Sequence, residues 1–186
     1  MRRLLLIIIA GSILLCGYYV SRMRSADVAR AVHAPSRPLT FVFLGDTSFG
    51  ENYQEEIERR GGDNVLKTKG YEHSLKRFAP FLRQADLVIA NLETPVTDLP
   101  SSPLTGKKVC VHHSDPVEAP RVLKEHNIGA VSLANNHTLD YGIMGLRQSL
   151  EALEEHDIQW FGAGTDEASA AEPLRFEHPP AGPSGW

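Results

Sequence analysis

The stretch AVSLANNHTLDYGIMGLRQSLEAL, residues 130–153, combines the patterns that decide the fold class. It begins with an apolar run over residues 130–134, which is typical of a buried strand. It ends with an amphipathic helix, whose apolar face is formed by Ile143, Leu146, Leu150 and Leu153. A polar segment separates the two. A strand, a polar loop and a helix in this order are typical of an α/β sheet with parallel strands.

Similar apolar runs lie on both sides of this stretch. We expect strands over residues 39–44, 87–90, 130–134 and 158–161, and the start of a fifth strand over residues 174–176. Amphipathic stretches separate these runs, and strands that alternate with helices indicate parallel pairing. The sequence therefore predicts an α/β domain over residues 39–177, with a parallel-rich sheet and flanking helices.

Two more helices are expected between these strands. The apolar spacing predicts one over residues 75–82, with a kink or a fresh start at Pro80. Another is expected over residues 115–126, with Asp115 as its N-cap and Glu118 at the capping-box position. Residues 94–106 are rich in Pro, Ser and Thr, which predicts a long loop.

Polar side chains follow three of the expected strands at the point where each strand ends. Asp46 follows the first strand, Glu93 follows the second, and Asn135, Asn136 and His137 follow the third. The carboxyl ends of parallel strands meet at one edge of a sheet, and ligand sites gather outside that edge. We therefore expect these side chains to share one site. Asn91 and Asp140 are further candidates beside them.

These residue types suit a divalent metal ion. Carboxylate oxygens, an amide oxygen and an imidazole nitrogen favour Mn, Fe, Zn or Mg over a metal that prefers thiolates. We expect Asp46, Glu93 and Asn136 as metal ligands, at one ion or at a pair that shares a bridging carboxylate. His137 is the expected catalytic residue, as a general acid or as an electrophile toward a phosphoryl oxygen.

Each of these residues also has a purely structural interpretation. Asp46 is equally suited to a turn or a helix N-cap, and Glu93 to an ordinary loop. The two asparagines suit a left-handed turn, and Asp140 suits the N-cap of the helix that follows it. His137 is the hardest to explain in this way, because a turn gives no reason for an imidazole after two amides.

The first 24 residues predict a segment that targets the chain to a membrane. Residues 4–20 contain no charge and are flanked by arginines, and a helix of this length is at the short end for crossing a bilayer. Tyr18 and Tyr19 at its far end favour an uncleaved signal anchor over a cleaved signal peptide. We expect a linker over residues 25–38 and the domain outside a bacterial cell membrane that the chain crosses once.

The charge balance bears on the partners. The chain has 19 Lys and Arg against 23 Asp and Glu, and four of the arginines lie in its first 24 residues, which contain no acid. The remainder therefore has 15 basic and 23 acidic residues, a net charge of −8. A nucleic-acid partner is not expected, because phosphate binding needs clustered positive charge. An anionic polymer would need local compensation, for which Lys107 and Lys108 are candidates.

Three other segments give weaker signals. Cys110, His112 and His113 have the residue types of a metal site but lack a second half with paired spacing, so a strand end is favoured. The segment Gly162-Ala163-Gly164 suits either a strand-to-helix turn or the backbone of a ligand site. Residues 178–186 are rich in Pro and Gly, which predicts an irregular tail.

Four motifs together resemble the CapA family, the capsule or poly-γ-glutamate synthesis proteins with a calcineurin-like metallophosphatase fold. They are LGDTSFG, ADLVIANLETPVT, the stretch quoted first and FGAGTDEASAAEPL, within residues 39–174. The resemblance implies that Asp46 is the first metal-binding Asp, that Glu93 stands at the bridging position and that Asn136 and His137 are the Asn-His pair. Position 48 is Ser where the broader motif has His. Because the family contributes further ligands from later strands, the resemblance implies a partial, C-terminally shortened domain.

The resemblance leaves two main functions open. One is an envelope-anchored, metal-dependent hydrolase of capsule or polyglutamate synthesis, acting on a phosphoester or an anionic polymer. The other is a non-catalytic scaffold of a polymer synthase or export complex. A third and weaker hypothesis is an extracytoplasmic ligand-binding protein that uses residues 162–164.

Overall fold

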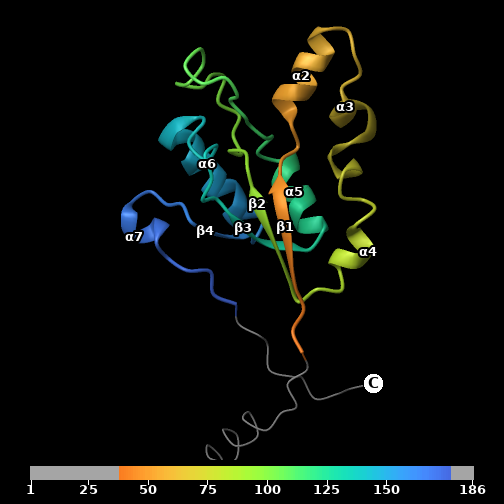
Figure 1. Ribbon diagram of the computed structural model, residues 1–186, viewed down its shortest axis with the longest axis vertical. Helices are drawn as coiled ribbons and strands as arrows, with labels where there is room; N and C mark the ends of the chain where they lie inside the picture. Colours follow the sequence, from red (N-terminus) through yellow and green to blue (C-terminus); the bar gives the residue numbers. More distant parts are fainter. Residues whose placement is uncertain (1–37, 177–186) are drawn as a thin grey trace, which may run out of the picture. The chain divides into compact units, whose positions relative to one another are not determined.

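The computed structural model describes residues 38–176, of which residues 39–175 form one compact unit. The strands are β1 (Phe41–Thr47), β2 (Leu87–Leu92), β3 (Ile128–Ser132) and β4 (Gln159–Phe161). The helices are α2 (Glu51–Arg59), α3 (Val65–Lys69), η1 (Tyr71–His73), α4 (Ala79–Leu82), α5 (Glu118–Glu125), α6 (Gly142–Glu155) and α7 (Glu167–Ala170). In Figure 1, α2 to α4 run along the β1 side of the sheet, and α6 and α7 lie on the β4 side.

All four strands are parallel and follow one another in the order β1-β2-β3-β4. The register pairs Asp46 with Asn91, and Asn91 with Ser132, at the carboxyl ends of β1, β2 and β3. The polar residues that follow these strands therefore emerge at the same edge of the sheet. This confirms the predicted parallel sheet with flanking helices.

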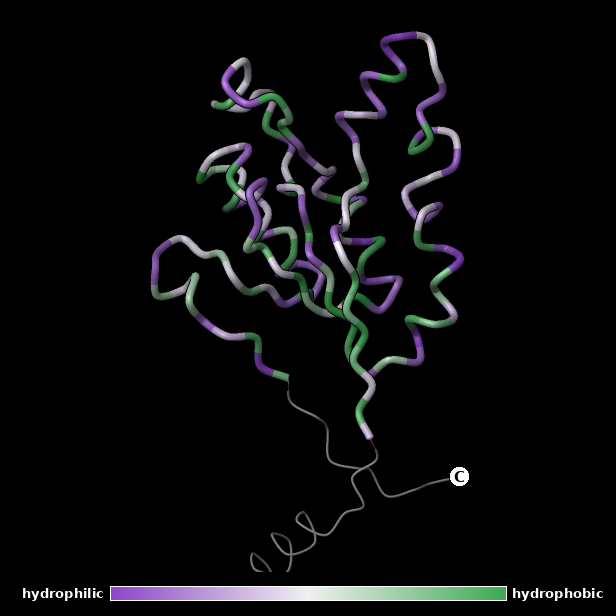
Figure 2. The backbone as a smooth tube through the Cα atoms, viewed as in Figure 1, coloured by the Kyte–Doolittle hydropathy of each residue, from purple (hydrophilic) through white to green (hydrophobic). Residues whose placement is uncertain are grey.

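The core lies between one face of the sheet and helices α5 and α6. Alternate residues of β2, Val88, Ala90 and Leu92, are at most 1% exposed and belong to one buried cluster with apolar residues of both helices. Along β1, Val42 packs against this core, whereas Phe43 points away from it and is 73% exposed. Figure 2 shows that the strands are the most hydrophobic part of the unit, whereas α2 is largely hydrophilic.

The helix that carries Ile143 and the helix after Asp115 are confirmed as α6 and α5. The N-cap of α5 is Val117 and not the expected Asp115, although Asp115 Oδ1 accepts the backbone N–H of Glu118 at 2.8 Å. The expected capping box is wrong: the backbone N–H of Asp115 donates to Glu51 Oε1 at 2.8 Å, so Glu51 takes the place expected for Glu118. Glu51 is buried, and this burial raises the pKa of its carboxyl group.

Several expectations need correction. The helix expected over residues 75–82 reduces to α4, which begins at Ala79 with Pro80 in its first turn, so the fresh start at Pro80 is the correct alternative. Residues 174–176 form no strand. Asp140 does not cap α6, whose N-cap is Tyr141, because the Asp140 side chain is used in a buried network. Helices α2, α3 and α7 were not expected, because their residues show no sustained apolar stripe.

The expected signal anchor over residues 4–20 and the tail over residues 178–186 lie outside the described residues, as does all but the last residue of the linker. Within residues 38–176 there is no helix of the length and apolarity that a bilayer crossing requires.

Candidate functional site

A row of hydrogen-bonded side chains connects the ends of three strands. Asn91 Nδ2, in β2, donates to Asp46 Oδ1 in β1 at 2.7 Å. Asn135 Nδ2, just beyond β3, donates to Asn91 Oδ1 at 3.2 Å and to the carbonyl of Leu92 at 2.9 Å. Asp46, Asn91 and Asn135 therefore lie in contact, as their positions after parallel strands predict.

Asn135 also holds the loop that carries the expected catalytic residue. Its Oδ1 accepts the backbone N–H of His137 at 3.0 Å and the hydroxyl of Thr138 at 3.2 Å. An Asn side chain that bonds its own backbone two residues on forms a tight Asx turn. This turn directs the chain from the end of β3 into the segment before α6, and it connects His137 to the row that starts at Asp46.

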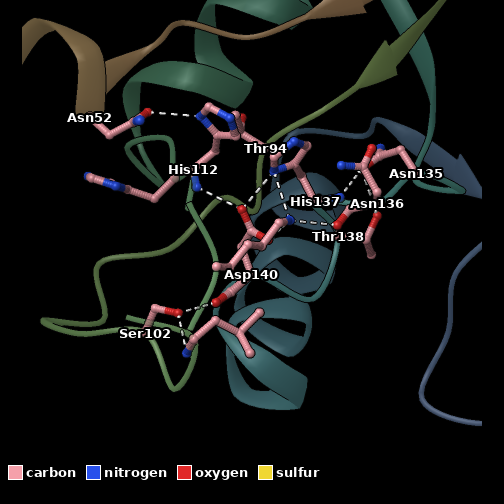
Figure 3. A network of polar contacts seen from close by, with 12 residues as sticks. Asn52, Thr94, Ser102, His112, Asn135, Asn136, His137, Thr138 and Asp140 are labelled. Atoms are coloured by element: carbon pink, nitrogen blue, oxygen red, sulfur yellow. Dashed lines mark hydrogen bonds and ion pairs between the residues drawn. The ribbon is translucent and has the colours of Figure 1, made fainter. Parts of the chain in front are cut away.

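His137 and Asp140 form the centre of a buried polar network (Figure 3). His137 is 7% exposed and Asp140 is fully buried. His137 Nδ1 lies 2.8 Å from Asp140 Oδ2, which also accepts the backbone N–H of His112 at 2.7 Å. The other oxygen, Oδ1, accepts from Lys108 Nζ at 2.5 Å. The Asp140 backbone carbonyl accepts from the hydroxyl of Ser102.

The network sets the charge of its members. Burial on its own would raise the pKa of Asp140, but the hydrogen bonds from Lys108, His137 and the His112 backbone outweigh it and hold that pKa below its usual value. Burial lowers the pKa of His112, and the nearby ring of His137 lowers it further. The two rings meet edge to face, with centroids 4.2 Å apart. Asp140 is therefore ionised at neutral pH, and His112 is uncharged.

The second nitrogen of His137, Nε2, is accessible. It makes no hydrogen bond within residues 38–176, and no fully buried side-chain nitrogen or oxygen in that part of the chain lacks a partner. Nε2 must therefore reach solvent, although the ring as a whole is almost covered. An imidazole held at Nδ1 by a carboxylate and open at Nε2 is arranged for proton transfer or for binding an electrophile.

Glu93 and Asn136 lie at the same edge of the sheet. The backbone N–H of Glu93 donates to the carbonyl of Thr47 at 3.1 Å, so the ends of β1 and β2 are joined there. Its half-buried carboxylate is close enough to His112 to oppose the lowering of that ring's pKa. Asn136 is exposed, and its backbone carbonyl accepts from Lys108 Nζ at 2.9 Å.

A cavity of about 680 Å³ adjoins this edge. Its lining includes Asn135, Asn136, residues 162–164 and the α6 side chains Ile143 and Leu146. Gly162 has φ +81°, and a Cβ atom there would lie 2.6 Å from Ala134 Cβ. Glycine is thus needed for a close turn, which supports the structural interpretation of residues 162–164.

The described residues do not complete a metal site. Across residues 38–176, no three side chains of His, Cys, Asp and Glu converge in a way that would hold a metal ion. Asp46 Oδ1 is bonded to an amide instead, and His137 Nδ1 to Asp140. The donor types suit a divalent ion, but the donor set of this part of the chain does not fit one fully, so we derive no reaction step through a metal.

Sequence reasoning missed two members of the network. In the sequence His112 belongs only to a weak metal motif, yet it packs on His137, and its Nδ1 lies 3.1 Å from Asn52 Oδ1 (Figure 3). Cys110 is exposed, and His113 turns to Tyr141, with its Nδ1 3.3 Å from the Tyr141 hydroxyl. The sequence presents Lys108 only as a source of positive charge, whereas the structure shows it bonded to Asp140. No sequence signal marked its partner.

Fold and site together define an α/β protein that gathers a polar site at the carboxyl edge of a parallel sheet. Residues 40–181 match the model of the family described as bacterial capsule synthesis protein PGA_cap, and the chain belongs to that family. The resemblance inferred from the motifs is thereby confirmed.

Two relatives point the same way. The chain is 30% identical over 141 residues to the capsule biosynthesis protein CapA of Bacillus anthracis. The aligned region covers 76% of this chain and 32% of that protein. It is 27% identical over 139 residues to the PGA biosynthesis protein CapA of Bacillus subtilis, covering 75% of this chain and 34% of that protein. The chain thus spans about a third of the length of these relatives.

Proposed function

We propose that this protein acts in bacterial capsule or poly-γ-glutamate biosynthesis, with the strand-end site around His137 as its reactive part. Membership of the capsule synthesis family supports the process, as do the names of the two relatives. The observation that carries the site is the imidazole of His137, which is almost buried, bonded to Asp140 at Nδ1 and open at Nε2.

In this proposal His137 is the catalytic residue of a hydrolase that acts on a phosphoester or a γ-glutamyl polymer. In its imidazolium form the ring carries on Nε2 the proton that the leaving group needs, while Asp140 accepts from Nδ1, keeps the ring oriented and stabilises that form. Asn135 holds the loop in place through the His137 backbone N–H. The cavity beside Asn136 has room for part of a substrate.

A divalent ion, Mn, Fe, Zn or Mg, is the proposed cofactor, as one ion or two. When bound, such an ion supplies Lewis acidity and an activated water. Asp46, Glu93 and Asn136 are the proposed ligands, with Asn91 and Asn135 as neighbours. No group of three His, Cys, Asp or Glu side chains forms within residues 38–176, so the proposed set depends on the amide of Asn136 as well as on the two carboxylates.

Metal binding is tested by titrating the full chain with Mn²⁺ and measuring the signal of the free ion by electron paramagnetic resonance. We expect binding that Asp46→Asn weakens by about tenfold or more, because the variant removes a charged ligand. Asp63→Asn, at an exposed acid remote in sequence from the strand ends, should bind as the intact chain does. Equal binding by both variants would contradict the assignment of Asp46.

The membrane location is also a proposal, carried by the uncharged run over residues 4–20 and the arginines on both sides of it. The domain would then face outward, beside a polymer synthase or export complex. The net charge of −8 beyond residue 24 disfavours long-range attraction of an anionic polymer, and Lys108 is neutralised by Asp140. A short local substrate contact is therefore favoured over a long groove.

One observation favours a second candidate, a non-catalytic scaffold in the same process: the incomplete set of metal donors. The two functions differ in what they require. A scaffold needs its membrane attachment but not His137, so deletion of residues 4–20 should abolish polymer production while His137→Gln leaves it unchanged. A hydrolase should lose function in both variants.

A further inference from the structure

Lys108 occupies an unusual position beside the proposed site. It lies in the segment between β2 and α5, and its side chain is 28% exposed. Its Nζ lies 2.5 Å from Asp140 Oδ1, 2.9 Å from the carbonyl of Asn136 and 3.2 Å from His137 Nδ1. One ammonium group thus contacts three residues of the loop that follows β3.

We propose that Lys108 is a positioning residue for His137, which fixes the imidazole with its proton on Nδ1 and its lone pair on Nε2. This inference rests on the proposed function, in which Nε2 is the reacting atom. Lys108 acts through Asp140 and through the backbone of Asn136, and it does not itself reach the accessible side of the ring.

The proton on Nδ1 follows from counting donors and acceptors. An ammonium group only donates, and Asp140 as a carboxylate only accepts. The carboxylate has Lys108 at one oxygen and the His112 N–H at the other, which leaves room at Oδ2 for a third donor. His137 Nδ1 is that donor at 2.8 Å, closer to the carboxylate than to Lys108 at 3.2 Å.

Lys108 is needed because Asp140 is fully buried. A buried carboxylate without a counter-charge is strongly disfavoured, and it then becomes neutral or moves toward water. Either change removes the acceptor that selects the Nδ1 proton. The bond from Lys108 to the Asn136 carbonyl adds a second restraint, because it fixes the backbone directly before His137.

The neighbouring lysine provides a matched control. Lys107 is exposed, and its Nζ donates to the carbonyl of Pro103 at 3.2 Å. The two residues are adjacent in sequence and carry the same charge, but only Lys108 contacts Asp140, Asn136 and His137. A difference between their variants therefore reports these contacts and not the net charge of the loop.

The first measurement uses the intact full chain. NMR of the imidazole nitrogens, at a pH where the rings are neutral, identifies which nitrogen of His137 carries the proton, with the resonances assigned by comparison with His137→Gln. We expect the Nδ1–H form to predominate. Predominance of the Nε2–H form would overturn the proposal, whatever the variants do.

The second measurement compares variants by the same method. Lys108→Met should raise the ratio of Nε2–H to Nδ1–H by about tenfold or more, which corresponds to about 1.4 kcal/mol. Lys107→Met should leave the ratio unchanged. Lys108→Arg should retain most of the Nδ1–H form, because a guanidinium also donates to a carboxylate.

A purely structural role would give a different result. Lys108→Met would then unfold at a lower temperature while its tautomer ratio stayed that of the intact chain, and this outcome overturns the proposal. If Lys108→Met does not fold, Lys108→Gln replaces it, with the same expected direction. The readout involves neither metal nor polymer, so a failure of the proposed function would leave this result standing.

Discussion

Asp140 is the residue on which the site depends most, because of the contacts of its carboxylate. It accepts from Lys108, from the backbone of His112 and from His137, and these donors come from two loops that lie far apart in the sequence. A fully buried carboxylate with this many donors couples the loop before α5 to the loop before α6. Its removal should therefore affect the fold as well as the chemistry.

We predict that Asp140→Asn lowers the free energy of unfolding by about 3 kcal/mol at neutral pH, because it leaves Lys108 without its buried counter-charge. The pKa of Asp140 in the folded chain lies below the usual value of 3.8, so its contribution is complete above that pH and is lost as the pH falls through the lowered pKa. Urea denaturation at several pH values measures this loss. If the difference in the free energy of unfolding between the intact chain and Asp140→Asn stays constant into strong acid, the ionised state assigned to Asp140 is contradicted.

His112 gives a prediction in a different pH range. Burial holds the pKa of its folded-state ring below 6.5, so the unfolded chain binds the proton more readily. Stability from this group is complete above 6.5 and declines as the pH falls through the lower folded pKa. The thermal midpoint of the intact chain should fall over this interval, and His112→Gln should show a weaker fall. Equal slopes would argue against a buried neutral ring.

At the residue level the sequence predicted the position of the site better than its contacts. Asp46, Asn135 and His137 were expected together because they follow parallel strands, and hydrogen bonds do connect them. The role of Asp140 was ambiguous, since an acid before a helix is most often an N-cap. Only the tertiary fold brings Lys108 and His112 to it, and a contact over about thirty residues leaves no local pattern.

At the scale of elements, the strands were predictable because each is a short apolar run between polar turns. Helix α2 was not, because its residues are mostly charged or polar and it is held instead by the buried contacts of Glu51. Residues 174–176 include the apolar residues expected of a strand, but they follow Pro173 and form no strand of the described sheet.

The two sides of the sheet should respond differently to mutation. Leu123→Ala, in α5, removes a side chain that is fully buried in the core, and we expect a loss of about 2–5 kcal/mol in the free energy of unfolding. Phe43→Ser, on the exposed side of β1, should change it by about 0.5 kcal/mol or less. Chemical denaturation compares the two. A large loss for Phe43→Ser would mean that this side of β1 is covered.

The turn after β4 provides a second test at this scale. Gly162→Ala places a methyl group at φ +81° and 2.6 Å from Ala134 Cβ, so we expect a destabilisation of about 1–3 kcal/mol. Gly45→Ala is the control, because φ there is not positive and a Cβ atom would meet nothing within 4 Å. Equal thermal midpoints for the two variants would show that the turn tolerates a side chain.

At the scale of the molecule, the chain combines membership of a known family with a polar site at the edge of its sheet. The family is established by the match over residues 40–181, while the chemistry depends on an arrangement within a third of the length of the relatives. The composition argues against a nucleic-acid partner and says little about other partners. The residue types predict a metal site, but within residues 38–176 they do not converge into a full set of metal donors. The proposed function therefore depends mainly on His137.

The most direct test measures capsular polymer in a bacterial strain that lacks its own copy of this protein and receives the intact chain, His137→Gln or His156→Gln. His156 is the control, since its Nδ1 lies 2.9 Å from the carbonyl of Ala152 near the end of α6, in sequence far from the strand-end loops. We predict that the intact chain and His156→Gln restore polymer to the same level, and that His137→Gln, present in equal amount, does not. Full restoration by His137→Gln would contradict the account.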